Sequence, residues 1–249
     1  MRKYLQNPNT PNKRVGGVIV DFRTNSDTIK SLEGLGIKVV PSIEVKTLHP
    51  SICGHPDMMI HHIENNRFVV AAECYDYFSS ILDDAVLIKG ADGLAEDYPK
   101  DILYNCAVCG DFVICNTACT AIEILSEYRR LKKKILNVKQ GYSKCSICMV
   151  NENAIITADE GIARVCKNNG FDVLKINPGN IELPGMNYGF IGGATGLIDK
   201  NILAVNGELK THPNGDAIRA FCKNYSVDVY ELKKGSITDI GSILPFFTF

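Results

Sequence analysis

Residues 141–159, GYSKCSICMVNENAIITAD, decide the fold because they have the pattern of a β-hairpin. Two apolar runs flank a tight turn at residues 151–153, and Asn residues there tolerate the positive φ that short hairpins require. Residues 160–169 (EGIARVCKNN) then place apolar side chains at helical spacing, Gly170 ends the helix, and residues 171–176 (FDVLKI) are typical of a strand. The stretch predicts a unit of strand, strand, helix and strand.

The same unit recurs along the chain at steps of roughly 45 residues, a period typical of propellers and solenoids. The matching hairpins are residues 54–73, 100–116 and 188–206, with a shortened one at residues 235–249. The helix and final strand that follow are expected at residues 75–82 and 85–88, 120–134 and 135–138, and 216–224 and 227–232. An isolated unit cannot bury its own sheet face, so the five units must pack together.

The last segment, residues 235–249, contains only the first strand of its unit. The missing strand, helix and final strand are expected at the N-terminus, at residues 15–23, 26–35 and 37–40. A C-terminal strand paired with residues 15–23 would close a ring and remove free sheet edges. The sequence therefore predicts an α/β fold, a five-fold pseudo-symmetric ββαβ propeller whose N- and C-terminal strands close the ring.

The bulk composition is that of an ordinary globular domain. The 249 residues are 45% hydrophobic and 22% charged, with a net charge of −1. This balance provides no basic stripe for a nucleic-acid backbone, and the basic run at residues 129–134 suits the negative end of a helix. We expect a single domain over residues 15–249, an N-terminal tail over residues 1–14, and no nucleic-acid partner.

Targeting and cofactor signals are also missing from the sequence. The polar first fourteen residues lack the apolar core of a signal peptide, and no run reaches the ~18 apolar residues of a membrane span. The ten Cys are then expected to be reduced thiols. Residues 191–196 (IGGATG) lie inside a hairpin, so they are not a nucleotide fingerprint, and their glycines are expected to allow a close approach. We expect a cytoplasmic protein with no cofactor and no membrane partner.

Polar residues gather where the hairpins begin, and in a ring these positions converge on a central channel. Alignment by the turns places Asp57, Asp101 and Lys144 at about one level, with His55, Cys145 and Asp239 as polar neighbours. Three carboxylates facing one channel would bind a cationic group such as guanidinium through charge-assisted hydrogen bonds. The alternative is that each Asp caps neighbouring backbone N–H groups.

The repeat pattern over residues 15–249 resembles the pentein fold of guanidine-modifying enzymes, which include arginine deiminases, dimethylarginine hydrolases and amidinotransferases. It is also similar to the ribosome anti-association factor of archaea and eukaryotes, which is not an enzyme. Residues 54–60 (GHPDMMI) resemble the His-x-Asp strand start of arginine deiminase-like enzymes. That resemblance implies a general acid/base role for His55 and a guanidinium-holding role for Asp57. Residues 21–23 (DFR) match a loop of these families with Arg and Asp, which implies a substrate contact for Arg23.

Two features depart from these families. Their His-bearing hairpin is a later unit, whereas here it is the first complete one. Their nucleophilic Cys lies in the last hairpin, where residues 236–242 (SITDIGS) contain none. Cys145 is the candidate substitute, because the adjacent Lys144 ammonium would favour a thiolate. The alternative is that Cys145 is a small hydrophobic residue of a strand.

Two Cys-x-x-Cys pairs, Cys106 with Cys109 and Cys145 with Cys148, superficially match a zinc ribbon. In an extended strand, residues i and i+3 face opposite sides, so one pair cannot hold one ion. We therefore expect no metal site, and a zinc-stabilised module remains a third interpretation.

The leading interpretation is a pentein-fold protein that binds a small cationic ligand, guanidino or amino-acid-like, in the central channel and hydrolyses it or transfers part of it. The expected catalytic residues are His55 and Cys145, and the expected binding residues are Asp57, Asp101, Lys144, Asp239 and Arg23. The rival is a non-catalytic binding or interaction protein on the same scaffold, since fold does not fix function. The missing C-terminal Cys favours this rival.

Overall fold

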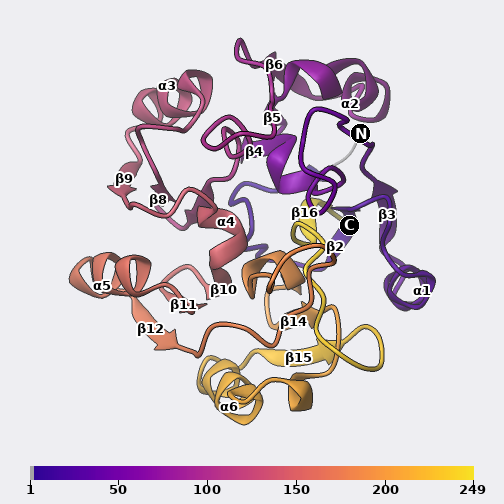
Figure 1. Cartoon of the computed structure of the whole chain (residues 1–249), viewed down its shortest axis with the longest axis vertical. Coiled ribbons are helices and arrows are strands. Elements are labelled where there is room, and N and C mark those ends of the chain that lie inside the picture. The colour runs from indigo at the N-terminus through magenta and orange to yellow at the C-terminus, as the bar shows by residue number, and fades with distance from the viewer. Residues whose placement is uncertain (1–2) are drawn as a thin grey trace.

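The computed structural model describes residues 3–249, an α/β fold in which these residues form five small sheets. Four sheets have three strands, and the remaining one has four in the order β1-β16-β2-β3. In each three-stranded sheet an antiparallel hairpin is followed by a third strand that pairs in parallel with the second. The helices that connect these strands lie toward the outside of the molecule in Figure 1.

The four complete units follow the predicted order of elements. The hairpins are β4 (Ile60–Glu64) with β5 (Arg67–Val70), β7 (Ala107–Cys109) with β8 (Phe112–Cys115), β10 (Cys148–Asn151) with β11 (Ala154–Thr157), and β13 (Thr195–Asp199) with β14 (Ile202–Val205). The connecting helices are α2 (Tyr75–Ile81), α3 (Ile122–Arg130), α5 (Glu160–Asn168) and α6 (Gly215–Asn224). The third strands are β6 (Val86–Lys89), β9 (Lys134–Asn137), β12 (Asp172–Lys175) and β15 (Asp228–Glu231).

The four-stranded sheet joins the two ends of the chain. β2 (Val15–Val20) pairs in parallel with β3 (Lys38–Pro41), with α1 (Ser26–Gly34) between them, and antiparallel with β16 (Leu244–Thr248). The predicted pairing of the two terminal strands is therefore present. The C-terminal strand is shorter than predicted, because residues 236–243 form a loop in which Gly241 and Ser242 have φ of 64° and 77°. Such positive φ values interrupt an extended strand.

Residues 3–9, within the segment expected as an N-terminal tail, contact the rest of the fold. β1 (Lys3–Tyr4) pairs with β16, and Leu5 is buried. The Asn9 amide donates to the Val108 carbonyl at 3.4 Å. Pro8 and Asn9 also line a cavity of about 20 Å³ together with Asp57 and Lys144. This segment therefore covers one side of the buried centre of the molecule.

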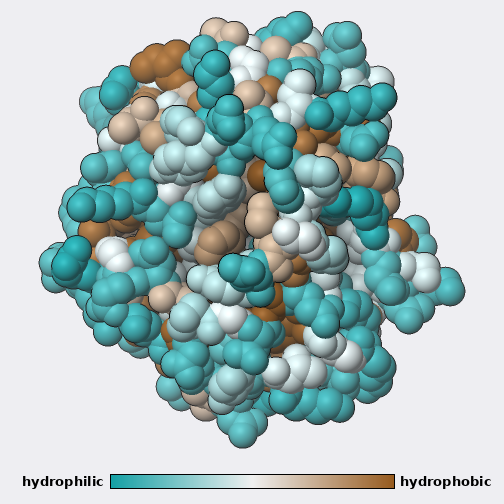
Figure 2. All heavy atoms as spheres, in the orientation of Figure 1, coloured by the Kyte–Doolittle hydropathy of each residue, from teal (hydrophilic) through white to brown (hydrophobic). Residues whose placement is uncertain are grey.

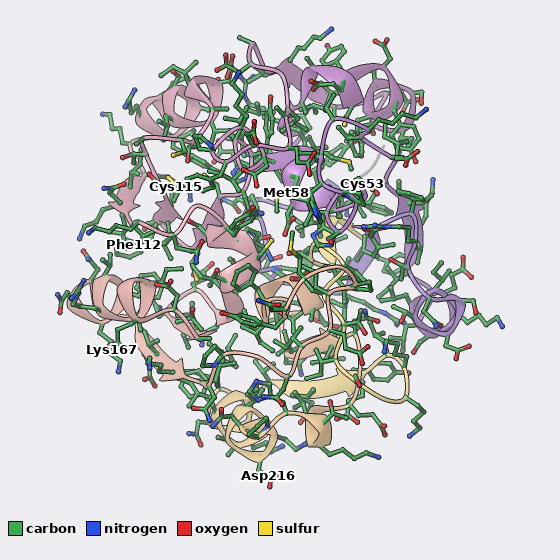
Figure 3. All side chains as sticks on the ribbon, in the orientation of Figure 1. Cys53, Met58, Phe112, Cys115, Lys167 and Asp216 are labelled. Carbon is green, nitrogen blue, oxygen red and sulfur yellow. The ribbon has the colours of Figure 1, made fainter. Side chains whose placement is uncertain are left out.

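The apolar core lies between neighbouring sheets, because successive side chains of a strand face opposite sides. In β10, Cys148 belongs to a cluster with Leu203 of the next hairpin, whereas Met149 belongs to a cluster with Ile114 of the preceding one. Each hairpin thus shares its two faces with its two neighbours. Lys167 and Asp216 lie at the periphery of Figure 3, and hydrophilic residues dominate the rim in Figure 2.

Removal of residues 235–249 should prevent the chain from folding as a monomer. The deletion takes away β16, which leaves β1 without a partner, exposes an edge of β2 and removes the buried Phe246. Free edges and exposed apolar faces promote association, so we expect the truncated chain to aggregate. Size-exclusion chromatography and thermal unfolding check this. A monodisperse truncation that unfolds cooperatively would contradict the role assigned to β16.

Three hairpins are preceded by a single helical turn instead of by an extended strand. These turns are η1 (Pro56–Met58), α4 (Ser143–Ser146) and η3 (Gly192–Ala194). Asp57, Lys144 and Cys145 were expected on strands, where neighbouring side chains point in opposite directions. On a turn they point in directions set by helical rotation instead. α4 lies near the middle of the molecule in Figure 1, and the labelled Met58 of η1 does so in Figure 3.

Candidate functional site

A cavity of about 290 Å³ is lined by His55, Met58, Tyr142, Cys145 and Asp239 together with a loop that contains Met186 and Tyr188. Its volume is near the lower end of the ~300–1,000 Å³ that is usual for small-molecule sites. Part of its wall is aromatic, because Tyr142 stacks on Phe190 with ring centroids 5.9 Å apart. The cavity therefore combines a polar floor, formed by His55, Cys145 and Asp239, with an apolar wall.

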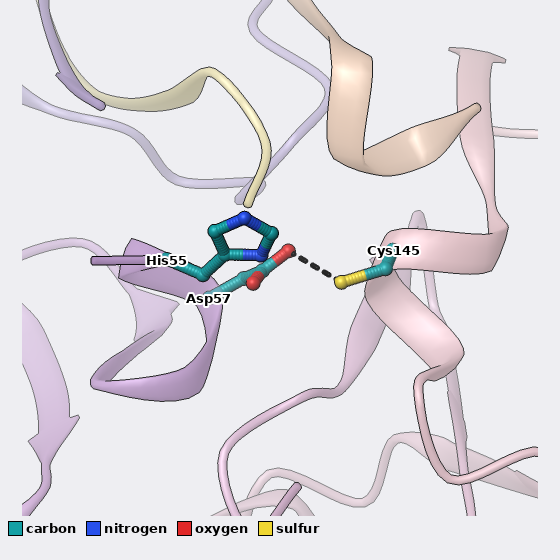
Figure 4. A group of neighbouring side chains, drawn as sticks. All are labelled: His55, Asp57 and Cys145. Atoms are coloured by element: carbon teal, nitrogen blue, oxygen red, sulfur yellow. Dashed lines mark hydrogen bonds between the residues drawn. The ribbon is translucent and has the colours of Figure 1, made fainter. Parts of the chain in front are cut away.

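His55 lies at the centre of the polar floor. Its Nε2 is 4.0 Å from Asp21 Oδ2 and its Nδ1 is 3.9 Å from Asp239 Oδ1. Single donor atoms of His55, Asp57 and Cys145 all lie within 4.8 Å of one another. Figure 4 shows how these three side chains face one another. His55 is 1% exposed, and its Nδ1 has no hydrogen-bond partner. The structure thus brings a buried imidazole close to three carboxyl groups and a thiol.

Asp57 accepts its hydrogen bonds from side chains. Cys145 Sγ donates to Asp57 Oδ2 at 3.1 Å, and Ser242 Oγ donates to the same oxygen at 2.7 Å. Lys144 Nζ donates to Ser242 Oγ at 2.9 Å. The other oxygen, Oδ1 of Asp57, is buried without a partner. Asp57 is therefore not a backbone cap, which was the alternative to a binding role.

The environment of Cys145 disfavours its thiolate. Burial raises the pKa of the Cys145 thiol well above its ordinary value, and the carboxylates of Asp57 and Asp239 raise it further, against a hydrogen bond from Asn105. The expectation that Lys144 would favour a thiolate is therefore wrong. The Lys144 ammonium donates to Ser242 and not to the thiol, and burial lowers its own pKa despite the nearby Asp57. Cys145 is therefore a neutral thiol that donates to Asp57.

Lys144 and Cys145 face different spaces, although they are neighbours in sequence. Cys145 lines the large cavity, whereas Lys144 lines two small ones together with Asn9. This follows from their place on α4, a helical turn. Lys144 and Asp57 were both predicted to contact a ligand, but neither lines the cavity at His55: both line one of the small cavities, where Ser242 joins them.

Asn105 was missed by the sequence analysis, and it fixes α4 in place. Its side-chain oxygen accepts from the backbone N–H of Lys144 at 2.7 Å and of Cys145 at 3.2 Å. Its amide donates to Cys145 Sγ at 3.2 Å. One buried amide thus positions both the backbone and the thiol of Cys145. The one available signal was its place as a single amide among the mainly apolar residues 102–107 (ILYNCA).

Asp101 and Arg23 lie outside the cavity wall. The Tyr142 hydroxyl donates to Asp101, so Tyr142 reaches the cavity and Asp101 lies behind it. Burial raises the pKa of Asp101, and the Tyr142 hydrogen bond opposes this shift. Arg23 forms a bidentate pair with Asp21, Nε to Oδ1 at 2.9 Å and Nη2 to Oδ2 at 2.6 Å. Asp21, which was quoted only as a neighbour of Arg23, is the residue of this loop that approaches His55.

Asp239 is held by the backbone. It accepts from the N–H of Phe190 at 2.8 Å and of Gly241 at 2.9 Å. A Cβ on Gly193 would collide with the Asp239 carboxylate. The predicted role of the glycines in residues 191–196, close approach of another group, is therefore confirmed at Gly193.

Asp239→Asn should change how stability depends on pH. Burial raises the pKa of Asp239 above its ordinary value of 3.8, the charge of His55 opposes the shift, and Asp57 adds to it. The folded state thus binds this proton more tightly than the unfolded state, so the carboxyl contributes stability that grows as the pH falls through the raised pKa toward 3.8. Acidification from neutral pH to about pH 4 should therefore raise the unfolding free energy of the wild type relative to that of Asp239→Asn. Urea unfolding at both pH values measures it, and a constant difference would contradict the assignment.

The Cys-x-x-Cys pairs do not assemble a zinc ribbon. Cys106 and Cys109 belong to different core clusters, as do Cys145 and Cys148. Strand alternation splits the pair of Cys106 and Cys109, as predicted. Within residues 3–249, the group of His, Cys and carboxyl side chains close enough to hold one metal ion is His55, Asp57 and Cys145.

Comparisons with known proteins agree with the fold. A search of curated proteins finds no match. Among solved structures, SxtG, an amidinotransferase of Microseira wollei in the saxitoxin biosynthetic pathway, matches with a TM-score of 0.57 and 12% identity over 92% of this chain and 90% of that one. DDAH from Pseudomonas aeruginosa, a Cys-to-Ser mutant complexed with citrulline, matches with a TM-score of 0.57 and 9% identity over 94% and 100%.

A third similar structure is the agmatine deiminase of C. jejuni, a Cys-to-Ser mutant with substrate bound. It matches with a TM-score of 0.58 and 10% identity over 99% of this chain and 96% of that one. In residues 3–249, no helix is both long and apolar enough to cross a membrane. The fold is the pentein fold of the guanidine-modifying enzymes, as the resemblance implied. Residues 19–244 match the model of a family of unknown function, DUF6873, and the chain belongs to that family.

Proposed function

We propose that this chain is a guanidine-modifying enzyme that binds a small guanidino compound in the cavity at His55 and hydrolyses or transfers its amidino group. The five sheets would form a five-fold pseudo-symmetric propeller around this cavity. The observation that carries the proposal is the cluster at His55: Asp21, Asp57 and Asp239 are buried beside one imidazole, with the Cys145 thiol 3.1 Å from Asp57. Buried carboxyl groups around a cavity favour a cationic ligand.

Binding would use both parts of the cavity. The guanidinium group would bind Asp239, which lines the cavity, and Asp57, which lies next to the lining residues His55 and Cys145 and whose Oδ1 is buried without a hydrogen-bond partner. Asp21 is already paired with Arg23, so it would orient His55 more than it would bind a second cation. The apolar wall, with the stacked rings of Tyr142 and Phe190, would contact the aliphatic part of the ligand.

A bound cation would oppose the groups that raise the pKa of Cys145. A positive charge beside the thiol lowers its pKa, against burial and the two carboxylates. The thiol proton would pass by way of Asp57 to His55, and Sγ would form a bond to the guanidino carbon. His55 would return the proton to the departing amine as the C–N bond breaks. Water would then break the C–S bond to give a ureido product, or an amine would accept the amidino group.

A non-catalytic binding protein is the second candidate, and one observation favours it. Cys145 donates to Asp57, and the surrounding groups disfavour its thiolate. A protein that only binds a cation has no need of an ionised thiol. The two candidates differ in whether the ligand is consumed.

A ligand screen separates these functions. Thermal shift and calorimetric titration with arginine and agmatine are expected to show 1:1 binding, and citrulline and lysine serve as uncharged-ureido and non-guanidino controls. Release of ammonia or formation of a ureido product identifies the enzyme. Binding without turnover, with or without an added amine acceptor, supports the second candidate. Equal binding of lysine and arginine would contradict a guanidino site.

A further inference from the structure

Three side chains of different donor chemistry meet beside the cavity: His55 and Cys145 line it, and Asp57 lies next to them and lines the small cavity with Lys144. His55 offers an imidazole nitrogen, Asp57 a carboxylate oxygen and Cys145 a thiol sulfur, and these atoms lie within 4.8 Å of one another. Figure 4 shows the imidazole and the thiol on either side of the Asp57 carboxylate. Two ligand atoms of one tetrahedral zinc ion are separated by roughly 3.5 Å, given bond lengths of about 2.0–2.3 Å. Small side-chain rotations would bring the three atoms to that spacing.

Two polar atoms of these side chains have no hydrogen-bond partner in the protein. Nδ1 of His55 and Oδ1 of Asp57 are both buried and without a hydrogen-bond partner. A buried polar atom without a partner costs about 1–3 kcal/mol, so each gains by acquiring one. The adjoining cavity also leaves room for a fourth ligand such as water. Three protein ligands with one open position are typical of reactive zinc sites, whereas structural sites use four protein ligands.

The charges around the cluster suit a divalent cation. Two buried carboxyl groups, Asp57 and Asp239, and the Cys145 thiolate formed on binding would place opposite charge beside a divalent ion, which limits the cost of burying it. Asp239 Oδ1, 3.9 Å from His55 Nδ1, adds negative potential beside the metal position.

We propose that His55, Asp57 and Cys145 form a binding site for one zinc ion, with its fourth position open to the cavity. The mixed nitrogen, sulfur and oxygen donors suit zinc better than magnesium or calcium, which bind oxygen ligands. This inference does not rest on the proposed function, because it needs only the donors and their spacing. Zinc and a guanidinium group would occupy the same place and exclude one another.

Binding would release a proton. The Sγ–H bond of Cys145 breaks, the Zn–S bond forms and the proton passes to the solvent, because a thiolate is the form that binds the metal. Affinity should therefore rise with pH. Calorimetric titrations of the wild-type protein with zinc in buffers of different ionisation enthalpy would count this proton, with about one expected per ion at neutral pH.

Cobalt titration of the metal-free full chain tests the site, because Co²⁺ bound to a thiolate absorbs in the near ultraviolet. The wild type is expected to show this band with a 1:1 end point. Cys145→Ser should abolish it, and His55→Gln should weaken cobalt binding by at least about tenfold. Cys109→Ser is the matched control, since Cys109 is buried and its Sγ donates to the Asn151 carbonyl outside the cavity. This control should bind cobalt like the wild type.

The outcomes separate clearly. A wild type without the thiolate band, a band that persists in Cys145→Ser, or a band that disappears in Cys109→Ser overturns the proposal. His55→Gln decides the case if Cys145→Ser fails to fold, because the Nδ1 atom of His55 has no hydrogen bond to lose. Unchanged cobalt affinity in His55→Gln then overturns it. Competition between agmatine and cobalt tests the proposed function separately, because the metal site does not depend on agmatine binding.

Discussion

Cys145→Ala is expected to abolish turnover of the guanidino substrate while the protein still folds and binds the ligand. Removal of a nucleophile that acts together with a general acid/base costs about 10⁴–10⁶ in kcat. The fold should survive because Asn105 still accepts from the two N–H groups of α4, and Asp57 still accepts from Ser242. The loss of the thiol should lower the free energy of unfolding by about 1–3 kcal/mol.

Steady-state assays of ureido product and calorimetric titration with agmatine measure the two effects separately. Cys53→Ala is the matched control, because Cys53 is also buried but its Sγ contacts the Pro50 carbonyl outside the cavity lining. This control should keep turnover within about threefold of the wild type. If Cys145→Ala keeps a kcat within tenfold of the wild type, the nucleophile is another group.

Asp57→Asn is expected to weaken both the fold and the ligand site. Lys144 is buried, which lowers its pKa, and the charge of Asp57 is the largest effect that opposes this shift. Loss of that charge leaves a buried ammonium without its partner, which should lower the free energy of unfolding by about 3 kcal/mol. This is the lower end of the cost of breaking a buried pair, because Ser242 lies between the two groups. Guanidino binding should be lost as well, because the amide cannot form a charge-assisted bond.

The stability loss in Asp57→Asn should shrink as the pH rises. Without Asp57, the pKa of Lys144 falls further below its ordinary value of 10.5. The unfolded state then binds the proton more tightly, so stability rises with pH between the lowered pKa and 10.5. Urea unfolding from neutral to alkaline pH measures this trend.

The double variant with Lys144→Met is the control for Asp57→Asn, since it removes the unpaired charge and should recover much of the loss. Asp101→Asn is the matched carboxyl control and should leave Lys144 unaffected, because Asp101 bonds to Tyr142. An equal loss in the single and double variants would show that the charge of Lys144 is not the cause.

The repeating units could be predicted from the sequence because their signals are local. The turn at residues 151–153, the apolar spacing of residues 160–169 and Gly170 lie within one short stretch, and they correspond to the hairpin of β10 and β11 and to α5. Pairing of the two chain ends followed from counting strands. The loop at residues 236–243 could not be predicted, because its backbone is set by contacts with Gly193 and Glu182 far away in the sequence.

The sequence by itself determined the order of elements and which residues stand at the start of each hairpin, so it nominated His55, Asp57, Asp239 and Cys145 together. Only the tertiary structure decided how they face one another, since Asp57 meets Cys145 from 88 positions away and Ser242 from 185. It also separated Lys144 from the cavity and placed Asp101 behind Tyr142. The physical reason is that orientation, burial and pKa depend on groups brought together from different units, whereas periodicity and turn residues act within one unit.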